Sequence, residues 1–199
     1  MRQSKGMKVL GITGGVGSGK SEVLHHMEKE YGAVVSQLDE VAKNLQRKGT
    51  ACYGKIIEQF GNKITKEDGE LDRRKLAEIV FQDETKRKIL NEIVHPEVKK
   101  WVKQDIIEKK KMGVPLYIIE AALLPEAGYE DICDELWYIY TEESVRRERL
   151  KRSRGYSDET ISRMILSQSP ESVFRGACQT IIDNSGTFEK TKEQIGEQL

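Results

Sequence analysis

The sequence predicts an α/β protein built on a parallel five-stranded sheet that is flanked by helices. Three observations predict this class: short apolar runs alternate with helical patterns, a glycine-rich turn follows the first run, and a long helical stretch separates the second run from the third. At 199 residues the chain suits one compact domain. We therefore expect a single domain that carries the helical stretch as an insertion and a pair of charged helices near its end.

Short apolar runs mark the predicted strands. The first run begins at Lys8 and ends at Thr13, immediately before a cluster of glycines. Further strands are predicted at residues 33–36, 114–119, 136–140 and 180–182. Strands of a parallel sheet are covered on both faces, so apolar runs are expected in place of strict alternation.

Helical periodicity fills the segments between these runs. The first predicted helix covers residues 21–31 and ends at Gly32. In the long stretch before the third strand, helices are predicted at residues 74–81 and 85–94. Pro96 is expected to begin a further helix as its first residue, and Trp101 is expected in the core because it lies on the apolar stripe of that helix.

Composition excludes two classes of partner. The chain has 33 Lys and Arg residues against 33 Asp and Glu residues, whereas a nucleic-acid-binding protein needs a surplus of basic residues. No apolar run approaches the length of a membrane span, so we expect neither nucleic acid nor membrane as partner. The 3 scattered cysteines fit free thiols in the cytoplasm better than disulfides. We expect a monomer or a weak homo-oligomer.

Residues 14–21 form a complete phosphate-binding loop. Their sequence, GGVGSGKS, fits G-x-x-x-x-G-K-[ST] and lies between a predicted strand and a predicted helix. Glycines allow successive backbone N–H groups to point at phosphates, and the helix N-terminus adds a partial positive charge. The residues expected to bind ATP are Gly15, Val16, Gly17, Ser18, Gly19, Lys20 and Ser21.

Two polar side chains of this loop have separate expected roles. Lys20 is expected to reach the β- and γ-phosphates and to act in catalysis, and the Ser21 hydroxyl is expected to bind Mg²⁺. The alternative is a glycine-rich turn without a ligand, which the flanking strand and helix disfavour. A signalling GTPase would carry an N-K-x-D motif, and the sequence has none. The chain length and the helical insertion favour a small-molecule kinase.

Beyond the loop, several segments resemble the dephospho-CoA kinase family. Residues 11–21 are similar to its T-G-G-[IV]-G-S-G-K-S loop, and further matches run in order along nearly the whole chain. These are 38–42 with I-D-A-D-x-[IV]-A, 71–76 with L-x-R-x-x-L, 90–98 with L-N-x-I-x-H-P, 123–126 with P-L-L-F-E, and 181–186 with V-I-D-N-x-G. The resemblance implies Mg²⁺- and ATP-dependent phosphorylation of the 3′-hydroxyl of dephospho-CoA.

The resemblance also implies how the domain is divided and where the acceptor binds. The expected parts are a nucleotide-binding core at 1–40, 113–140 and 171–199, a helical acceptor insertion at 41–112, and a lid at 141–170. Arg74 is expected to pair with the pyrophosphate of dephospho-CoA. His95 is expected to be structural or to position the substrate, and Leu123 is a further expected substrate contact.

Two acids follow predicted strands, at the edge where such sheets carry their ligand crevice. Asp39 is expected to accept or orient the proton of the attacking hydroxyl; the alternative is a cap for a helix that begins near Val41. Glu120 is expected to contact Mg²⁺ through water, with an ordinary loop acid as the alternative. The family usually has Asp there, and Gln37 and Gln179 replace two more of its acids. A weakened nucleotide-binding paralogue, or another small-molecule or nucleoside monophosphate kinase, therefore stays an alternative.

The predicted lid consists of two helices joined by a short turn. Thr141 is expected to cap the first helix, Gly155 to end it, and Ser157 to cap the second. Closure of such a lid over ATP would exclude water from the transferring phosphoryl group.

Arginines are concentrated on the first lid helix. A guanidinium that meets the transferring phosphoryl group stabilises its charge, and Arg149 is the expected catalytic arginine. Arg152 and Arg154 are expected to contact ATP. A solvated face is expected for Arg146 or Arg147, because not all five arginines can converge on one site.

Overall fold

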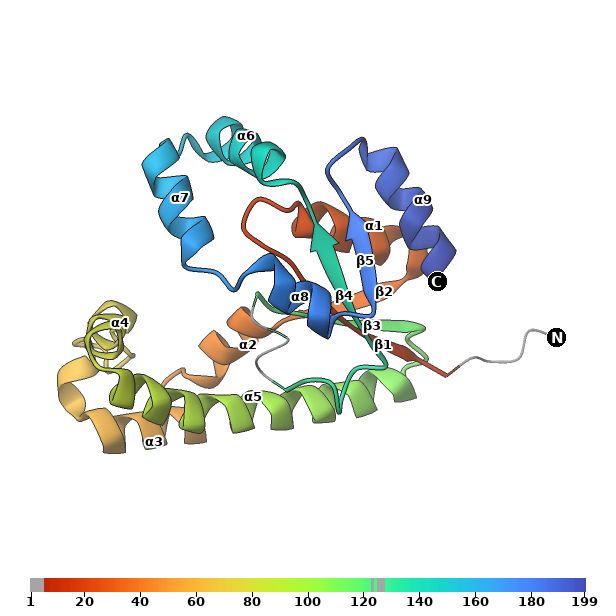
Figure 1. The fold of residues 1–199 in the computed structure, drawn as a ribbon. Coiled ribbons are helices and arrows are strands. Elements are labelled where there is room, and N and C mark those ends of the chain that lie inside the picture. The colour runs from red at the N-terminus through yellow and green to blue at the C-terminus, as the bar shows by residue number, and fades with distance from the viewer. Residues whose placement is uncertain (1–5, 123, 125–127) are drawn as a thin grey trace. The chain divides into compact units, whose positions relative to one another are not determined.

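The computed structural model describes residues 6–122, 124 and 128–199, and it has the predicted α/β architecture (Figure 1). Its parallel sheet has the strand order β2-β3-β1-β4-β5. The strands are β1 (Lys8–Thr13), β2 (Ala33–Gln37), β3 (Leu116–Glu120), β4 (Glu135–Tyr140) and β5 (Thr180–Asp183). Each predicted strand is confirmed, and β3 shows the largest difference because it begins at Leu116.

Nine α-helices are described, eight of them between strands and α9 after the last strand. They are α1 (Lys20–Tyr31), α2 (Leu38–Leu45), α3 (Ala51–Phe60), α4 (Arg73–Gln82), α5 (Glu84–Lys111), α6 (Glu143–Arg154), α7 (Asp158–Leu166), α8 (Glu171–Ala177) and α9 (Phe188–Gln198), with a 3-10 turn η1 (Asn62–Ile64). Gly32 ends α1 as predicted, with a φ of 63°. A residue without Cβ adopts that left-handed conformation without steric cost.

By its internal packing the chain divides into two compact units. We call them the sheet unit (Met1–Ser36 and Lys109–Leu199) and the helical unit (Gln37–Glu108). The functions expected for the core, the insertion and the lid are not decided by this division and stay predictions.

The core of the sheet unit lies between the sheet and two helices, α1 and α9 (Figure 1). Apolar side chains from the strands interlock there with those of the helices, and removing them from water is the main stabilising contribution to this unit. The core residues are Leu10, Ile12, Val23, Leu24, Met27, Ala33, Leu116, Ile118, Trp137, Ile139, Ile182 and Ile195. This core holds β1 and α1 in place on either side of the phosphate-binding loop.

Helix α5 runs without a break through Pro96, so the prediction that Pro96 begins a new helix is wrong. Proline inside a helix removes one backbone hydrogen bond and costs about 3 kcal/mol. Val94, Val98 and Val102 share one face of α5 and are all buried, so burial on both sides of the proline offsets this cost. Trp101 is 37% exposed and is not the core residue that we expected.

The caps of the two helices that were predicted to form a lid have different outcomes. Ser157 caps α7 as predicted, because its hydroxyl accepts a hydrogen bond from the Thr160 N–H at 3.2 Å. Gly155 ends α6 as predicted, with a φ of 65°. Thr141 does not cap α6, because Glu142 occupies that position. The buried hydroxyl of Thr141 instead donates a hydrogen bond to the Ser18 carbonyl of the phosphate-binding loop.

The three cysteines are free thiols. Burial raises the pKa of Cys133 to about 12 and the pKa of Cys178 to about 11, so both are protonated at neutral pH. Within the described residues, no helix has the length and apolar character needed to cross a membrane.

Candidate active site

The phosphate-binding loop connects β1 to α1, and its glycines are needed for two reasons. Gly17 and Gly19 have positive φ angles of 76° and 82°, a conformation that L side chains rarely adopt. A Cβ at Gly19 would lie 2.3 Å from the amide nitrogen of Asn184, and one at Gly15 would lie 2.6 Å from the Arg146 guanidinium. The glycines therefore allow both the turn and the close approach of groups that pack behind the loop.

The Ser18 carbonyl accepts hydrogen bonds from three side chains. The donors are Asn184 Nδ2 at 2.8 Å, Thr141 Oγ1 at 2.9 Å and Arg149 Nη1 at 3.4 Å. Across a trans peptide the carbonyl and the following N–H point in opposite directions, so this arrangement turns the Gly19 N–H away from the three donors. It is the orientation that an anion-binding loop requires.

Several N–H groups of the loop are left for a ligand. In the described part of the chain, the N–H groups of Gly17, Gly19 and Ser21 donate to no protein acceptor. The loop lines a cleft of ≈ 650 Å³, a size typical of small-molecule sites. Sequence-predicted residues that line it are Gly15, Val16, Gly17, Ser18, Gly19, Lys20, Ser21, Glu120, Arg149, Arg152 and Arg154.

Lys20 and Glu120 lie together in this cleft. Lys20 Nζ is 3.9 Å from a Glu120 carboxylate oxygen and donates to the Gly14 carbonyl at 2.5 Å. The Glu120 carboxylate and the Ser21 hydroxyl are oxygen ligands of the kind that Mg²⁺ prefers. No group of three or more His, Cys, Asp or Glu side chains suited to a metal occurs among the described residues. An ion here would depend on oxygen atoms from the nucleotide.

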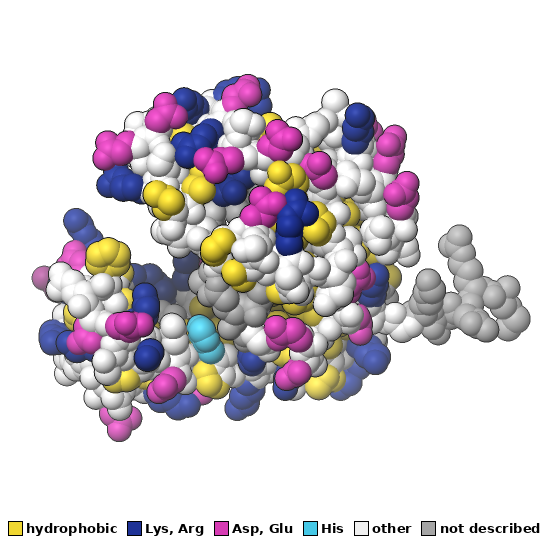
Figure 2. Space-filling model, in the orientation of Figure 1, with side chains coloured by type: hydrophobic (Ala, Val, Ile, Leu, Met, Phe, Trp, Pro, Cys, Tyr) yellow, Lys and Arg dark blue, Asp and Glu magenta, His cyan; other side chains and the backbone are white. Residues whose placement is uncertain are grey.

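The arginines expected to contact ATP differ in how firmly the protein holds them. Arg149 is half-buried, and its Nη2 donates to the Asn184 carbonyl at 2.8 Å. Arg152 and Arg154 are exposed on the cleft, and neither has a polar partner in the part of the chain that the structure describes. Figure 2 shows Lys and Arg side chains interspersed with acidic ones on the surface over α6 and α7. Besides Lys20, the cleft therefore has one anchored arginine and two arginines without a described partner.

The remaining arginines of α6 depart from the expected solvated face. Arg147 is half-buried and pairs with Glu143 at 2.7 Å, as surface helix residues often do. Arg146 is also half-buried, and its Nε donates to the Val16 carbonyl at 2.8 Å. Periodicity contained a signal for this contact, since Arg146 and Arg149 are three residues apart and share a helix face with buried Leu150.

In the helical unit, Asp39 lies in the first turn of α2. The N-cap position belongs to Gln37, so the alternative that Asp39 serves as the helix cap is wrong. The Asp39 side chain is exposed and has no hydrogen bond or ion pair with any described residue.

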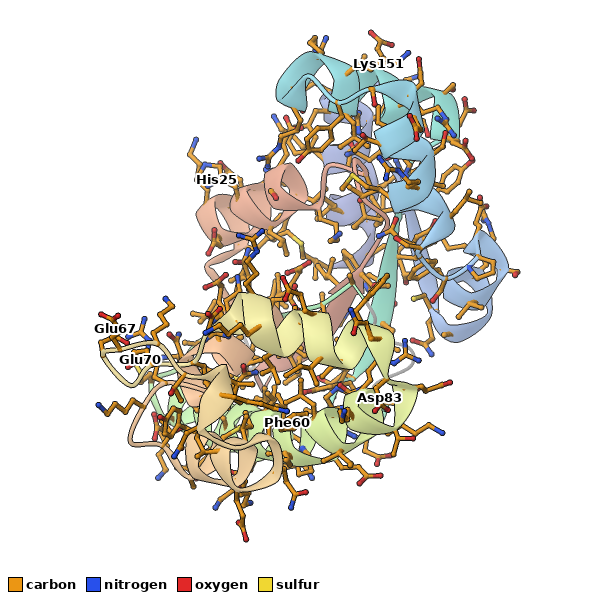
Figure 3. All side chains as sticks on the ribbon, turned by 90° about the vertical axis from the view of Figure 1, so that its left-hand side faces the viewer. His25, Phe60, Glu67, Glu70, Asp83 and Lys151 are labelled. Atoms are coloured by element: carbon orange, nitrogen blue, oxygen red, sulfur yellow. The ribbon has the colours of Figure 1, made fainter. Side chains whose placement is uncertain are left out.

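A second cleft, of ≈ 460 Å³, lies within the helical unit. Arg74, the residue expected to bind pyrophosphate, lines this cleft and is 3.7 Å from Glu78. The cations on its walls are Lys43, Arg47, Lys66, Arg73 and Arg74, and the acids are Glu40, Glu70 and Asp72. Figure 3 shows Glu70 beside Glu67 on the loop that precedes α4.

Arg73 is a residue that the sequence analysis passed over. It occupies the arginine of the L-x-R-x-x-L pattern, which was the available signal. Its guanidinium donates to the Lys43 carbonyl at 2.6 Å and to Gln46 at 3.1 Å. Arg73 therefore connects α4 to α2 at the wall of the cleft.

The structure says less about the other two expected substrate contacts, His95 and Leu123. His95 lies on the surface in the middle of α5, and partial burial of its ring, with Lys99 nearby, lowers its pKa. It is therefore neutral at pH 7. Leu123 lies outside the described residues.

A phosphate loop between β1 and α1, a cleft lined by arginines, and this strand order define a P-loop small-molecule kinase. The dephospho-CoA kinase family model matches residues 8–190. The chain therefore belongs to the dephospho-CoA kinase family. Its activity is the ATP-dependent phosphorylation of dephospho-CoA, a step in coenzyme A biosynthesis.

Individual relatives agree with this family. A dephospho-CoA kinase of Carboxydothermus hydrogenoformans is 37% identical over 190 residues, which cover 95% of this chain and 91% of the relative. The structure of TT1252 from Thermus thermophilus is similar, with a TM-score of 0.80, 27% identity, and coverage of 98% of this chain and 97% of that one. A dephospho-CoA kinase structure from Campylobacter jejuni shares the fold at 23% identity, with a TM-score of 0.69 and coverage of 96% and 94%.

Proposed function

We propose that the cleft of the sheet unit binds the γ-phosphoryl donor as Mg²⁺-ATP and that transfer to the 3′-hydroxyl of dephospho-CoA takes place at its mouth. The observation that carries this proposal is the loop itself: its Gly19 N–H is turned away from the three donors at the Ser18 carbonyl, and the N–H groups of Gly17 and Ser21 have no acceptor among the described residues. Ser21 and Glu120 would hold Mg²⁺ directly or through water. Lys20 would neutralise charge on the β- and γ-phosphates during transfer.

Asp39 is proposed as the group that accepts or orients the proton of the attacking hydroxyl. It follows the carboxyl end of β2, the edge of a parallel sheet at which such enzymes bind their ligands. Its carboxylate is exposed and has no partner among the described residues, and no capping role accounts for it. A free carboxylate is the state that a general base requires.

Arg149 is proposed as the arginine that stabilises the transferring phosphoryl group, with Arg152 and Arg154 as further ATP contacts. The anchored guanidinium of Arg149 loses little freedom when it meets a phosphate. Arg152 and Arg154 are exposed, so their side chains lose more conformational entropy when they are ordered by a phosphate. The expected order of importance is therefore Arg149 first, then Arg152 and Arg154.

The cleft of the helical unit is proposed as the acceptor site. Its five cations, Arg74 among them, face three acids, and dephospho-CoA carries a pyrophosphate that cations bind well. Arg73 joins this set through its anchored position. His95 and Leu123 stay proposed substrate-positioning residues.

The departures from the family pattern do not argue for lost activity. Gln179 accepts a hydrogen bond from the Leu136 N–H at 2.8 Å, a structural task that needs only an acceptor. Glu120 reaches the cleft and lies beside Lys20. We also propose that the enzyme works in the cytoplasm as a monomer or weak homo-oligomer and binds no nucleic acid, as its balanced charge and free thiols suggest.

The decisive experiment compares acceptors at a fixed concentration of Mg²⁺-ATP. Formation of ADP is measured with dephospho-CoA, AMP, CMP, UMP and shikimate. We expect turnover with dephospho-CoA to exceed turnover with every other acceptor by at least about 10²-fold, because a site built for polar groups rejects acceptors that lack them. Faster turnover with a nucleoside monophosphate would overturn the acceptor assignment, and turnover with none would indicate a binding protein.

A further inference from the structure

The backbone N–H and the backbone carbonyl of Val16, at the tip of the phosphate-binding loop, are both held by side chains from outside the loop. The Val16 N–H donates to Gln168 Oε1 at 2.9 Å, and the Val16 carbonyl accepts from Arg146 Nε at 2.8 Å. Arg146 Nη2 also donates to Gln168 Oε1, at 3.0 Å. The three residues therefore form a closed ring of hydrogen bonds in which one amide oxygen serves two donors.

The two side chains come from opposite ends of the helix pair predicted to be the lid. Arg146 lies in the first turn of α6, and Gln168 follows the end of α7 by two residues. The backbone of Gln168 is fixed in turn, because its N–H donates to the Ile165 carbonyl at 3.1 Å. The α6–α7 pair is thus attached to the loop at both of its ends.

Water cannot easily replace the contact between the Arg146 guanidinium and the loop backbone. Arg146 is half-buried, and this burial lowers the pKa of its guanidinium. A Cβ at Gly15 would lie 2.6 Å from that guanidinium, so the loop packs directly on it. A buried cation that loses an acceptor carries a larger cost than the net value of the lost hydrogen bond.

We propose that Gln168 and Arg146 are a positioning pair for phosphoryl transfer, which set the orientation of the loop tip from the lid. With the Val16 N–H taken by Gln168, the phosphates are left to Gly17, Gly19 and Ser21, whose N–H groups have no acceptor in the described structure. Neither side chain of the pair needs to touch the reacting atoms. The proposal rests on the binding of ATP in this cleft, and it deepens that assignment by naming what holds the loop.

The test uses the full chain and isothermal titration with Mg²⁺-ATP. Gln168→Leu keeps the approximate shape of the side chain and removes the acceptor, and it should raise the Kd for ATP about tenfold. Gln168→Glu keeps an oxygen that can serve both donors and should stay within about threefold of the parent chain. Arg146→Met should match Gln168→Leu, and the double variant should be little worse than either, because the two residues act as one unit.

A matched control separates positioning from general stability. Gln179 also accepts a backbone N–H with its Oε1, at 2.8 Å, but at the start of β4. Gln179→Leu should lower the melting temperature much as Gln168→Leu does, while leaving the Kd for ATP within about twofold.

Two results would overturn the proposal. One is a Gln168→Leu variant that loses stability as the control does and binds ATP normally. The other is additive effects of Gln168→Leu and Arg146→Met on the Kd, because independent contacts would then explain both. Failure of the wider assignment looks different: if ATP did not bind in this cleft, Lys20→Ala would bind ATP as tightly as the parent chain does, whichever way the Gln168 and Arg146 variants bind.

Discussion

The phosphate-binding loop and the cleft of the helical unit are both suited to phosphate, and they differ in how much the protein itself already holds. In the loop, the Ser18 carbonyl accepts hydrogen bonds at 2.8, 2.9 and 3.4 Å, and Asn184, one of the donors, is buried. In the helical unit, Arg47 and Lys66 line a cleft, and their side chains have no partner among the described residues. One region presents fixed backbone groups, and the other presents five cations of which these two are not held by a described residue.

This difference has a physical consequence for binding. A loop that is ordered before the ligand arrives loses little entropy on binding, and its dipoles are already aimed at the position where charge develops. Long cationic side chains must be ordered by the ligand, at a cost of up to about 2 kcal/mol each in rotamer freedom. We therefore expect substitutions at the loop to reduce kcat and substitutions in the helical cleft to raise KM for the acceptor.

The largest effect is expected for Lys20→Ala. The Lys20 ammonium lies in the cleft, where it contacts the Gly14 carbonyl and the Glu120 carboxylate. No other side chain of the loop carries a charge. Turnover with dephospho-CoA should fall by at least about 10³-fold while the chain stays folded. Lys8→Ala is the matched control, since it removes a lysine that pairs with Glu135 at 3.1 Å at the opposite end of β1. A folded Lys20→Ala variant with near-parental turnover would show that this loop does not carry the reaction.

The next largest effect is expected for Asp39→Asn, which is nearly isosteric and cannot take a proton. The value of kcat should fall by at least about 10²-fold, with little change in the Kd for ATP. Asp83→Asn, in the same unit, serves as the control. A loss of stability without loss of kcat in Asp39→Asn would assign this carboxylate a structural role.

Arg149→Ala is expected to follow. The guanidinium anchored beside the loop should stabilise the transition state more than bound ATP, so kcat should fall by about 10²-fold and ATP affinity only modestly. Arg149→Lys should rescue activity in part, because an ammonium lacks the two-pronged geometry. Arg147→Ala should change kcat little, since Arg147 does not line the cleft and its guanidinium is bound instead by Glu143 and, at 3.0 Å, by the Ser162 hydroxyl. Equal, small effects at both positions would remove the catalytic role of Arg149.

Parts of the fold and of the site could be predicted from the sequence alone, and other parts could not. The strands were predictable because each is a short apolar run bounded by turn residues, and the loop was predictable because its chemistry needs a fixed pattern. Pro96 misled because the rule for proline is local, whereas α5 is held together by valines on both sides of it. Trp101 misled because a helical stripe does not say how far burial extends around the helix.

The supports of the loop were the least predictable part of the site. Thr141, Asn184 and Arg149 meet at one carbonyl from positions 123, 166 and 131 residues away in the chain. No local pattern links such residues, because only the packing of the strands brings them together. The I-D-N-x-G match pointed to Asn184 without a role, and the role is to hold the loop.

A smaller effect is expected when the free cations of the helical unit are removed. Lys66→Ala and Arg47→Ala should each raise KM for dephospho-CoA by about tenfold and leave kcat and KM for ATP nearly unchanged. The KM for dephospho-CoA should also rise with ionic strength, because exposed charges are screened. Lys103→Ala, on an exposed part of α5 outside this cleft, is the control. Changes in kcat alone would place these two cations outside the acceptor site.

The smallest effect concerns Asp72, which caps α4 at the wall of this cleft. Its carboxylate accepts from the N–H groups of Arg74 and Lys75, each at 3.2 Å, and so holds the turn that presents Arg73 and Arg74. These bonds, chiefly the one from the Lys75 N–H, lower the pKa of Asp72. Asp72→Ala should reduce the melting temperature by about 2–4 °C and raise KM for dephospho-CoA about threefold, whereas Asp72→Asn, also a good cap, should do neither at pH 7.

The pH dependence of Asp72 gives this last prediction its sign. A carboxyl group whose pKa is lower in the folded chain stabilises the fold fully above its unfolded pKa, and that contribution disappears as the pH falls through the folded pKa. The difference in stability between the parent chain and Asp72→Ala should therefore be constant from pH 5 to 7 and shrink below about pH 4. Thermal unfolding of both chains across this range measures it. A difference that grows on acidification would mean that Asp72 does not act as a charged cap, and the turn that presents Arg73 and Arg74 would need another support.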